Sequence, residues 1–142
     1  MAFIGFNIKK ILVDKKSMNP GKMSINNNIA ITKVEFSKVA LDPSKTSINY
    51  SFTFSSKYEK DVAEILIEGD LLALEEKEHG TKIVDEWKKT KKLSKEIATP
   101  ILNNILSKCN IEAILLSKEV NLPPPVQLPK IGSVEQKVTS TQ

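Results

Sequence analysis

The stretch that decides the fold is ILNNILSKCNIEAILLSKEV, residues 101–120, together with NLPPPVQLP, residues 121–129, which follows it directly. In the first segment, apolar residues recur at steps of three and four, which is the spacing of one face of an α-helix: Ile101, Ile105, Cys109, Ala113, Leu116 and Val120. The prolines at 123–125 hold the chain extended and exclude the preceding residue from the helical region. We therefore expect a long helix that ends in a stiff, extended exit.

The start of this helix can be interpreted in two ways. Thr99 and Pro100 form a helix start signal, because threonine can cap free backbone N–H groups and proline is tolerated in the first turn. Alternatively, LSKEIA at residues 93–98 is already helical, and Pro100 then lies inside a longer helix.

The apolar stripe of the long helix is wider than contact with one sheet face requires, because four further residues extend it: Leu102, Leu106, Ile114 and Leu115. This width favours two partners, a sheet on one side and a second subunit on the other. The alternative is a central core helix of a monomer. The exit that follows either packs back along the domain or forms a docking arm.

Four strands are predicted before the helices, at residues 6–14, 29–39, 47–55 and 62–75, with an asparagine-rich loop at 17–28. The third strand alternates strictly, with serine, threonine and asparagine on one face and four large apolar residues on the other: Ile48, Tyr50, Phe52 and Phe54. Such alternation is typical of an antiparallel sheet with one buried face.

In the fourth strand, Gly69 predicts a bend at which the alternation breaks. A charged turn is expected at residues 75–80 and a short amphipathic helix at 81–93, whose apolar patch contains Ile83, Val84 and Trp87. The fold class is therefore α+β: a four-stranded antiparallel meander sheet with a short helix and a long C-terminal helix packed on one face. Residues 1–131 form a single domain, and residues 132–142 are expected to be a disordered tail.

The composition narrows the classes of function. All 21 basic residues are lysine, and the net charge is +4. Sequence-specific readers of nucleic acid favour arginine, so the composition disfavours that class. No apolar run is long enough to cross a membrane, and the N-terminus does not have the pattern of a signal peptide. The single cysteine, Cys109, fits a small buried residue in a reducing compartment, so a cytoplasmic protein is expected.

No arrangement of residues indicates an enzyme. The five glycines are scattered singly, so no phosphate-binding loop is predicted, and the serines lie in no nucleophile pattern. His79 is the only histidine and lies among acidic residues, where a solvated surface position is expected. We therefore predict no catalytic residues, no metal site and no cofactor, and interpret the chain as a binding protein.

Two short segments resemble the SecB chaperone family: FNIKKILV at residues 6–13 and LSKEVNLPPPVQLPKI at residues 116–131. The order of the elements, with four strands followed by a long helix and a proline-rich exit, is also similar. The LPPP segment further resembles that of certain archaeal proteins. The chain departs from the family pattern in its lysine-rich helix and in lacking a second helix and an acidic end after the exit.

The resemblance implies an ATP-independent chaperone that holds unfolded or pre-secretory polypeptides in apolar grooves and assembles into a homo-oligomer, either a dimer or a tetramer. The residues interpreted as contacting clients are Tyr50, Phe52, Phe54, Leu122, Val126 and Leu128. The first strand and the long helix would join the subunits, through Ile8, Leu12, Leu102, Leu106, Cys109 and Ala113. Two alternatives stay open: an adaptor for one specific protein partner, and weak nucleic-acid binding through the lysine cluster between Lys88 and Lys95.

Overall fold

The computed structural model describes residues 1–16, 24–38 and 43–125. Val126 and Leu128 of the predicted client site lie outside the described residues, as does the predicted tail. The described elements, in chain order, are β1 (Ala2–Lys15), β2 (Ile25–Phe36), β3 (Lys45–Tyr58), the short 3-10 turn η1 (Glu59–Asp61), β4 (Ala63–Glu76), α1 (Lys77–Thr90) and α2 (Lys95–Glu119).

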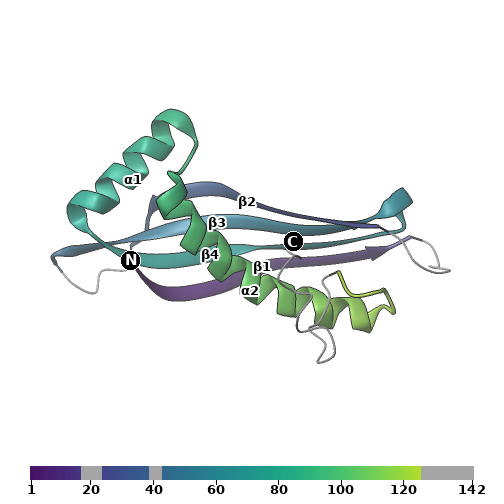
Figure 1. The fold of residues 1–142 in the computed structure, drawn as a ribbon. Coiled ribbons are helices and arrows are strands. Elements are labelled where there is room, and N and C mark those ends of the chain that lie inside the picture. Colours follow the sequence, from purple (N-terminus) through teal and green to yellow (C-terminus); the bar gives the residue numbers. More distant parts are fainter. Residues whose placement is uncertain (17–23, 39–42, 126–142) are drawn as a thin grey trace, which may run out of the picture.

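The four strands form one antiparallel sheet in the order β1-β4-β3-β2 (Figure 1). This confirms the predicted α+β class with a four-stranded antiparallel sheet. The meander holds for β2, β3 and β4, whereas β1 pairs with β4 rather than with its sequence neighbour β2. Strands β1 and β2 are therefore the two edges of the sheet.

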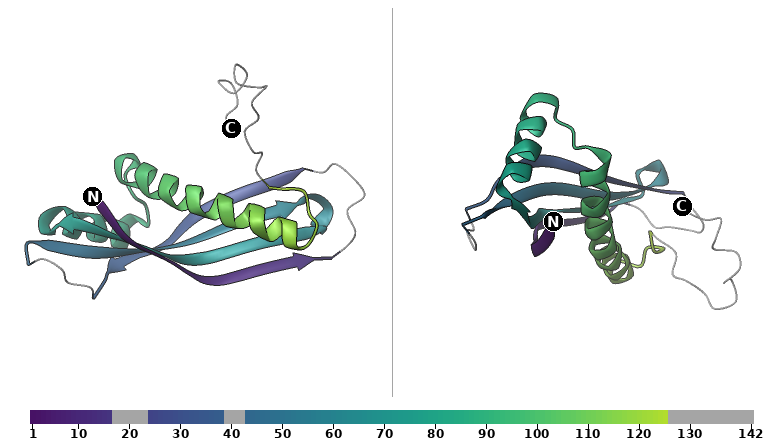
Figure 2. Two further views of the ribbon diagram at one scale, coloured as in Figure 1. Left: turned by 90° about the horizontal axis from the view of Figure 1, so that it is seen from below. Right: turned by 60° about the vertical axis from the view of Figure 1, so that its left-hand side comes forward.

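Both helices cover the same face of the sheet (Figures 1 and 2). The core lies between them and the sheet, where the alternating residues of β3 and β4 are fully buried. Helix α1 contributes the predicted patch of Ile83, Val84 and Trp87, all of which are buried. Its Gly80 packs closely against Thr46 at the start of β3, where a Cβ atom would meet the threonine methyl group.

Several predicted boundaries were wrong. Strand β2 begins at Ile25, so the three asparagines lie in a strand and not in a loop. The predicted charged turn at residues 75–80 does not exist, because β4 runs to Glu76 and α1 begins directly at Lys77. Helix α2 begins at Lys95, so Pro100 lies inside the helix, and the second interpretation of its start is correct.

Strand β4 is also more regular than predicted. The residues of its helix-facing side are buried without interruption from Ala63 to Glu75, so the alternation does not break after Gly69. The irregularities lie in the partner strand β1, where the register shifts between Phe3 and Gly5 and again between Ile8 and Lys10. At the second shift, β1 approaches so closely that a Cβ atom on Gly69 would collide with the carbonyl oxygen of Asn7. Gly69 is therefore required by the close approach of two backbones.

Replacing Gly69 by alanine should loosen β1, because the added methyl group meets a backbone atom that cannot rotate away. We expect Gly69→Ala to lower the free energy of unfolding by about 2 kcal/mol, as in other overpacked sites. Urea unfolding measures this loss. Gly5→Ala is the matched control, because its new methyl group would meet a movable Leu72 side-chain atom at 3.2 Å. An equal loss in both variants would contradict this explanation.

Candidate functional site

The three aromatic residues of the predicted client site lie in the core. Tyr50, Phe52 and Phe54 are 0–1% exposed. Phe6 of β1 stacks on Phe52 with ring centroids 5.4 Å apart. The strict alternation that suggested a groove floor places these side chains on the sheet face that the helices cover. In the single chain, these three aromatic side chains are therefore inaccessible to a client. The accessible apolar residues lie beside them.

The proline-rich exit packs back onto the sheet over its described part. The Tyr58 hydroxyl donates a hydrogen bond to the Pro123 carbonyl oxygen at 2.6 Å, and the Asn27 amide nitrogen donates one to the Pro125 carbonyl oxygen at 3.0 Å. Asn27 is itself held by the Ser56 hydroxyl at 2.6 Å. Of the predicted client-binding residues in the exit, Leu122 is buried, with 6% of its surface exposed.

The end of α2 is also tied to β1. The Lys15 ammonium group donates a hydrogen bond to the Val120 carbonyl oxygen at 2.8 Å. A lysine in this position bonds a carbonyl that has no partner within the helix and suits the negative end of the helix dipole. Earlier in the same helix, Lys108 lies over the ring of Phe6, with its nitrogen 4.8 Å from the ring centroid. Helix α2 therefore runs along β1 between these two contacts.

One side of α2 consequently faces the β1 edge of the sheet. Ile111 and Leu115 lie three and seven residues after Lys108, so all three share that side of the helix. Their exposed fractions are 61% and 53%. Ile11 of β1 lies opposite the buried Ile67 on the helix-facing side of the sheet and is 45% exposed. We call Ile11, Ile111 and Leu115 the outer flank.

The opposite side of α2 faces β2. Leu102, Leu106 and Ile114 are half-buried there, while Ile29 and Ile31 of β2 are half-buried on the helix-facing side of the sheet. Their cross-strand neighbours on β3 are the fully buried Phe54 and Phe52. We call Leu102, Leu106, Ile114, Ile29 and Ile31 the inner flank. These five residues lie next to the aromatic core, and each remains partly exposed to solvent.

The residues predicted to form the subunit interface differ in their burial. Leu12 is 42% exposed at the β1 edge, and Ile8, Leu102 and Leu106 are half-buried. Cys109 and Ala113 are fully buried and face the sheet. Burial, together with the nearby charge of Glu112, raises the pKa of the Cys109 thiol to about 12, so it is un-ionised at neutral pH.

His79 is half exposed at the surface, as the sequence predicted, and it also contacts a buried carboxylate. Its Nδ1 lies 3.0 Å from Oε1 of Glu75, which is buried at the end of β4, and the pair anchors α1 to the sheet. Within the described part of the chain, the second carboxylate oxygen of Glu75 and the Tyr50 hydroxyl have no hydrogen-bond partner. Burial, and secondarily the charge of Glu75, raises the pKa of Tyr50.

The face of the sheet that carries no helices contains a polar cluster that sequence reasoning did not identify. Asp70 lies 2.8 Å from the Lys9 ammonium group and accepts a hydrogen bond from the Ser51 hydroxyl at 2.8 Å. Burial opposes ionisation of Asp70, but hydrogen bonds from Lys9, Ser51 and Asn49 outweigh it and lower the pKa of the carboxyl group. The cluster ties three neighbouring strands together on the side without helices.

In residues 1–16, 24–38 and 43–125, no group of three or more histidine, cysteine, aspartate or glutamate residues is placed to hold a metal ion. Neither helix in that part of the chain is long and apolar enough to cross a membrane.

Replacing Tyr58 by phenylalanine should release the exit, because the Pro123 carbonyl loses its donor. We expect Tyr58→Phe to lower the free energy of unfolding by about 1 kcal/mol, as measured by urea unfolding at neutral pH. Ser107→Ala is the control, because its hydroxyl bonds only within α2.

The Tyr58 contribution should also depend on pH. Burial raises the pKa of Tyr58 from its ordinary value of 10.0 to about 12. The folded state thus favours the protonated phenol, and the stabilisation is complete below pH 10 and disappears as the pH rises towards 12. The stability difference between the natural chain and Tyr58→Phe should shrink over that interval. A constant difference would contradict the assignment.

Comparison with known proteins finds a match in structure alone. No protein-family model and no curated protein matches the sequence. Among solved structures, the chain is similar to the Mycobacterium tuberculosis SecB-like chaperone Rv1957, solved in complex with a ChAD peptide from the HigA1 antitoxin. The TM-score is 0.53 at 13% sequence identity, over 91% of this chain and 88% of that chain. This neighbour is bacterial and gives no support to the archaeal resemblance. The chain has a SecB-like fold.

Proposed function

We propose that this protein is an ATP-independent chaperone that holds unfolded or pre-secretory polypeptides, works in the cytoplasm and assembles as a homo-oligomer. The observation that carries the proposal is the SecB-like fold, shared over 91% of the chain with a protein described as a chaperone. The apolar flanks on both sides of α2 support it, because exposed apolar surface marks interaction sites.

The inner flank is the surface we assign to clients. It contains side chains from both α2 and β2. These side chains lie next to the buried aromatic residues of β3, so the apolar surface of the inner flank is continuous with the core. Strand β2 is an edge of the sheet, so its outward backbone groups are open to an extended peptide. An unfolded chain presents both features that such a surface binds, which are apolar side chains and free backbone groups.

The outer flank is the surface we assign to subunit contact. Strand β1 is the other edge of the sheet, and pairing it with a second copy would bury Ile11 on one face and Leu12 on the other. The same approach would bring Ile111 and Leu115 of α2 against the partner. An edge strand covered in this way also loses its tendency to aggregate.

An adaptor for one specific partner is the second candidate. The structural neighbour was solved with a peptide from an antitoxin, so this fold can bind a segment of a defined protein. The two functions differ in breadth, because a holdase binds many unfolded chains whereas an adaptor binds one partner.

A light-scattering assay tests the chaperone function. A denatured model protein is diluted into buffer with and without this protein, without ATP, at low and high salt. We expect suppressed aggregation that persists at high salt, because apolar contacts are not screened by ions. No suppression of any of several unrelated denatured proteins would leave the adaptor as the better description.

Variants of the inner flank locate the client surface. We expect Leu102→Gln combined with Ile31→Thr to weaken client binding about tenfold, as loss of central apolar contacts does elsewhere. Leu102→Gln keeps a similar side-chain size, Ile31→Thr keeps the β-branch with one heavy atom fewer, and circular dichroism checks the fold. The control is Leu115→Gln, which lies on the other side of α2. Equal loss in the control would show that clients do not depend on the inner flank.

Variants of the outer flank test the subunit contact. Ile111→Asp with Leu115→Asp should shift the mass measured by multi-angle light scattering to a smaller species, because desolvating two carboxylates opposes assembly. Both side chains are more than half exposed, so the fold of the single chain should persist. An unchanged mass would place the subunit contact elsewhere.

A further inference from the structure

A cavity between the two helices lies apart from both flanks. Its volume is about 210 Å³, and one side of α1 lines it through residues spaced at three and four, including Lys82 and Ile83. The connection between the helices and the first turns of α2 complete it with Lys92, Leu93 and Ile97. It is smaller than the about 300–1,000 Å³ of typical pockets for drug-sized ligands. Its size therefore suits one or two side chains of a partner.

The floor and rim of this cavity differ in chemistry. Ile83, Leu93 and Ile97 give it an apolar floor. Lys82 and Lys92 give it a cationic rim, and Glu86 is the single acidic residue in its lining. The ion pairs of the described residues involve other lysines, so these two have no carboxylate partner there.

Hydrogen bonds hold the connection between the helices in place. The Lys91 amide donates to the Trp87 carbonyl oxygen at 2.8 Å, with Lys91 in the left-handed conformation that ends α1. The Lys92 amide donates to the Thr90 hydroxyl at 3.2 Å. The backbone that carries Lys92 is therefore positioned before any partner binds, which lowers the entropic cost of binding.

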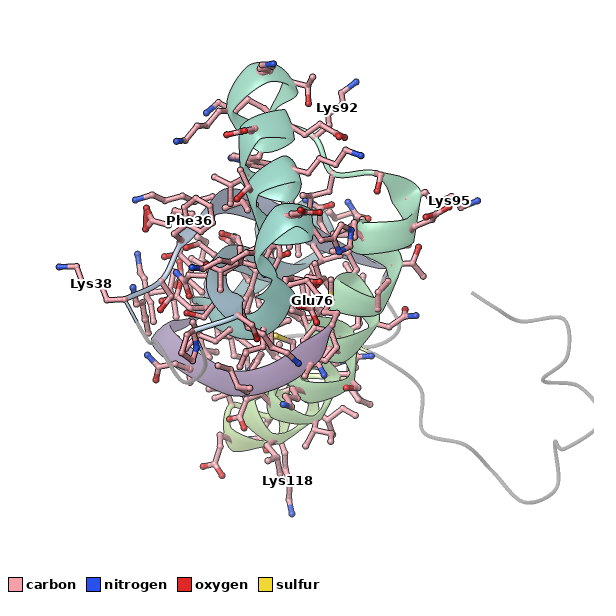
Figure 3. All side chains as sticks on the ribbon, turned by 90° about the vertical axis from the view of Figure 1, so that its left-hand side faces the viewer. Phe36, Lys38, Glu76, Lys92, Lys95 and Lys118 are labelled. Carbon is pink, nitrogen blue, oxygen red and sulfur yellow. The ribbon has the colours of Figure 1, made fainter. Side chains whose placement is uncertain are left out.

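The surface around the cavity is positively charged, like the rim. Figure 3 shows Lys92 and Lys95 at the junction of α1 and α2, where they point outward. Lys88 and Lys89 occupy the last turn of α1. Trp87, the aromatic residue nearest to them in sequence, is only 8% exposed, so it offers no platform on which a nucleobase could stack.

We propose that this lysine-rimmed cavity binds a short acidic segment of a partner protein, with one apolar side chain of that segment seated on the Ile83–Leu93–Ile97 floor. Charge complementarity identifies the partner as acidic, and the apolar floor distinguishes a peptide from a nucleic acid. The site is separate from the surfaces assigned to clients and subunits, so it would recruit a partner independently of chaperone activity.

Fluorescence anisotropy with labelled peptides tests this site. The probe is a short peptide with one leucine flanked on both sides by glutamates, measured with the full-length protein. We expect the glutamine analogue and the leucine-to-alanine analogue each to bind about tenfold more weakly, since each removes one of the two kinds of contact. Equal binding of either analogue, or no binding of the parent peptide, would overturn the proposal.

Charge reversal of the rim locates the site. Lys82→Glu with Lys92→Glu should weaken the parent peptide about tenfold. The matched control is Lys38→Glu with Lys118→Glu, which changes the net charge equally at positions that Figure 3 shows far from the junction. An equal loss of peptide affinity in the control would show that the peptide is attracted by the overall positive charge of the protein and not by this rim. Tighter binding of a single-stranded oligonucleotide of equal charge, with displacement of the peptide, would show a nucleic-acid surface and reject the peptide site. Light scattering of denatured clients should be unchanged in the rim variant.

Discussion

The contact of α2 with the sheet is the constraint on which the rest of the structure depends. The buried residues of α2 recur every four positions, from Ile101 to Ser117. Four residues exceed one helical turn by about 40°, so this buried line winds around the helix. To keep its buried residues on the sheet, α2 must cross the strands diagonally, as Figure 1 shows. Cys109 and Ala113 are the third and fourth of these five buried residues, and their small side chains let the helix approach β4 closely.

Because a single helix lies diagonally on a four-stranded sheet, some apolar surface stays uncovered. A helix is about 10 Å wide, whereas strands are spaced at about 4.8 Å, so at any one point along its length α2 covers about two strands and leaves the others partly open. This explains why Phe52 and Phe54 are buried while their β2 neighbours Ile29 and Ile31 are half-buried. It also explains why Ile11 of β1 remains exposed. The two flanks are thus a geometric consequence of the fold.

Local periodicity in the sequence predicted the elements and the fold class well. The alternation of β3 and the helical spacing of α2 each depend on neighbouring residues only, so both were correct in kind. The place of β1 beside β4 depends on contacts between distant parts of the chain, and no local pattern encodes it. Gly69 was misinterpreted for the same reason, because the backbone that requires a glycine there belongs to β1. The asparagines of β2 favour loops in isolation, yet Asn27 is held in a strand by Ser56 and the proline exit.

The candidate site was less predictable than the fold, because exposure is decided by how many neighbours reach a residue and not by its type. Tyr50 and Leu122 have the apolar character expected of client contacts, but both are buried in the hydrophobic core. Ile111 lies off the four-residue line and so remains exposed, although its side chain is as apolar as that of buried Ile105. The residues suited to binding are therefore apolar residues of the kind found in the core whose positions leave them outside it. In this fold, they gather where the diagonal helix leaves the sheet edges open.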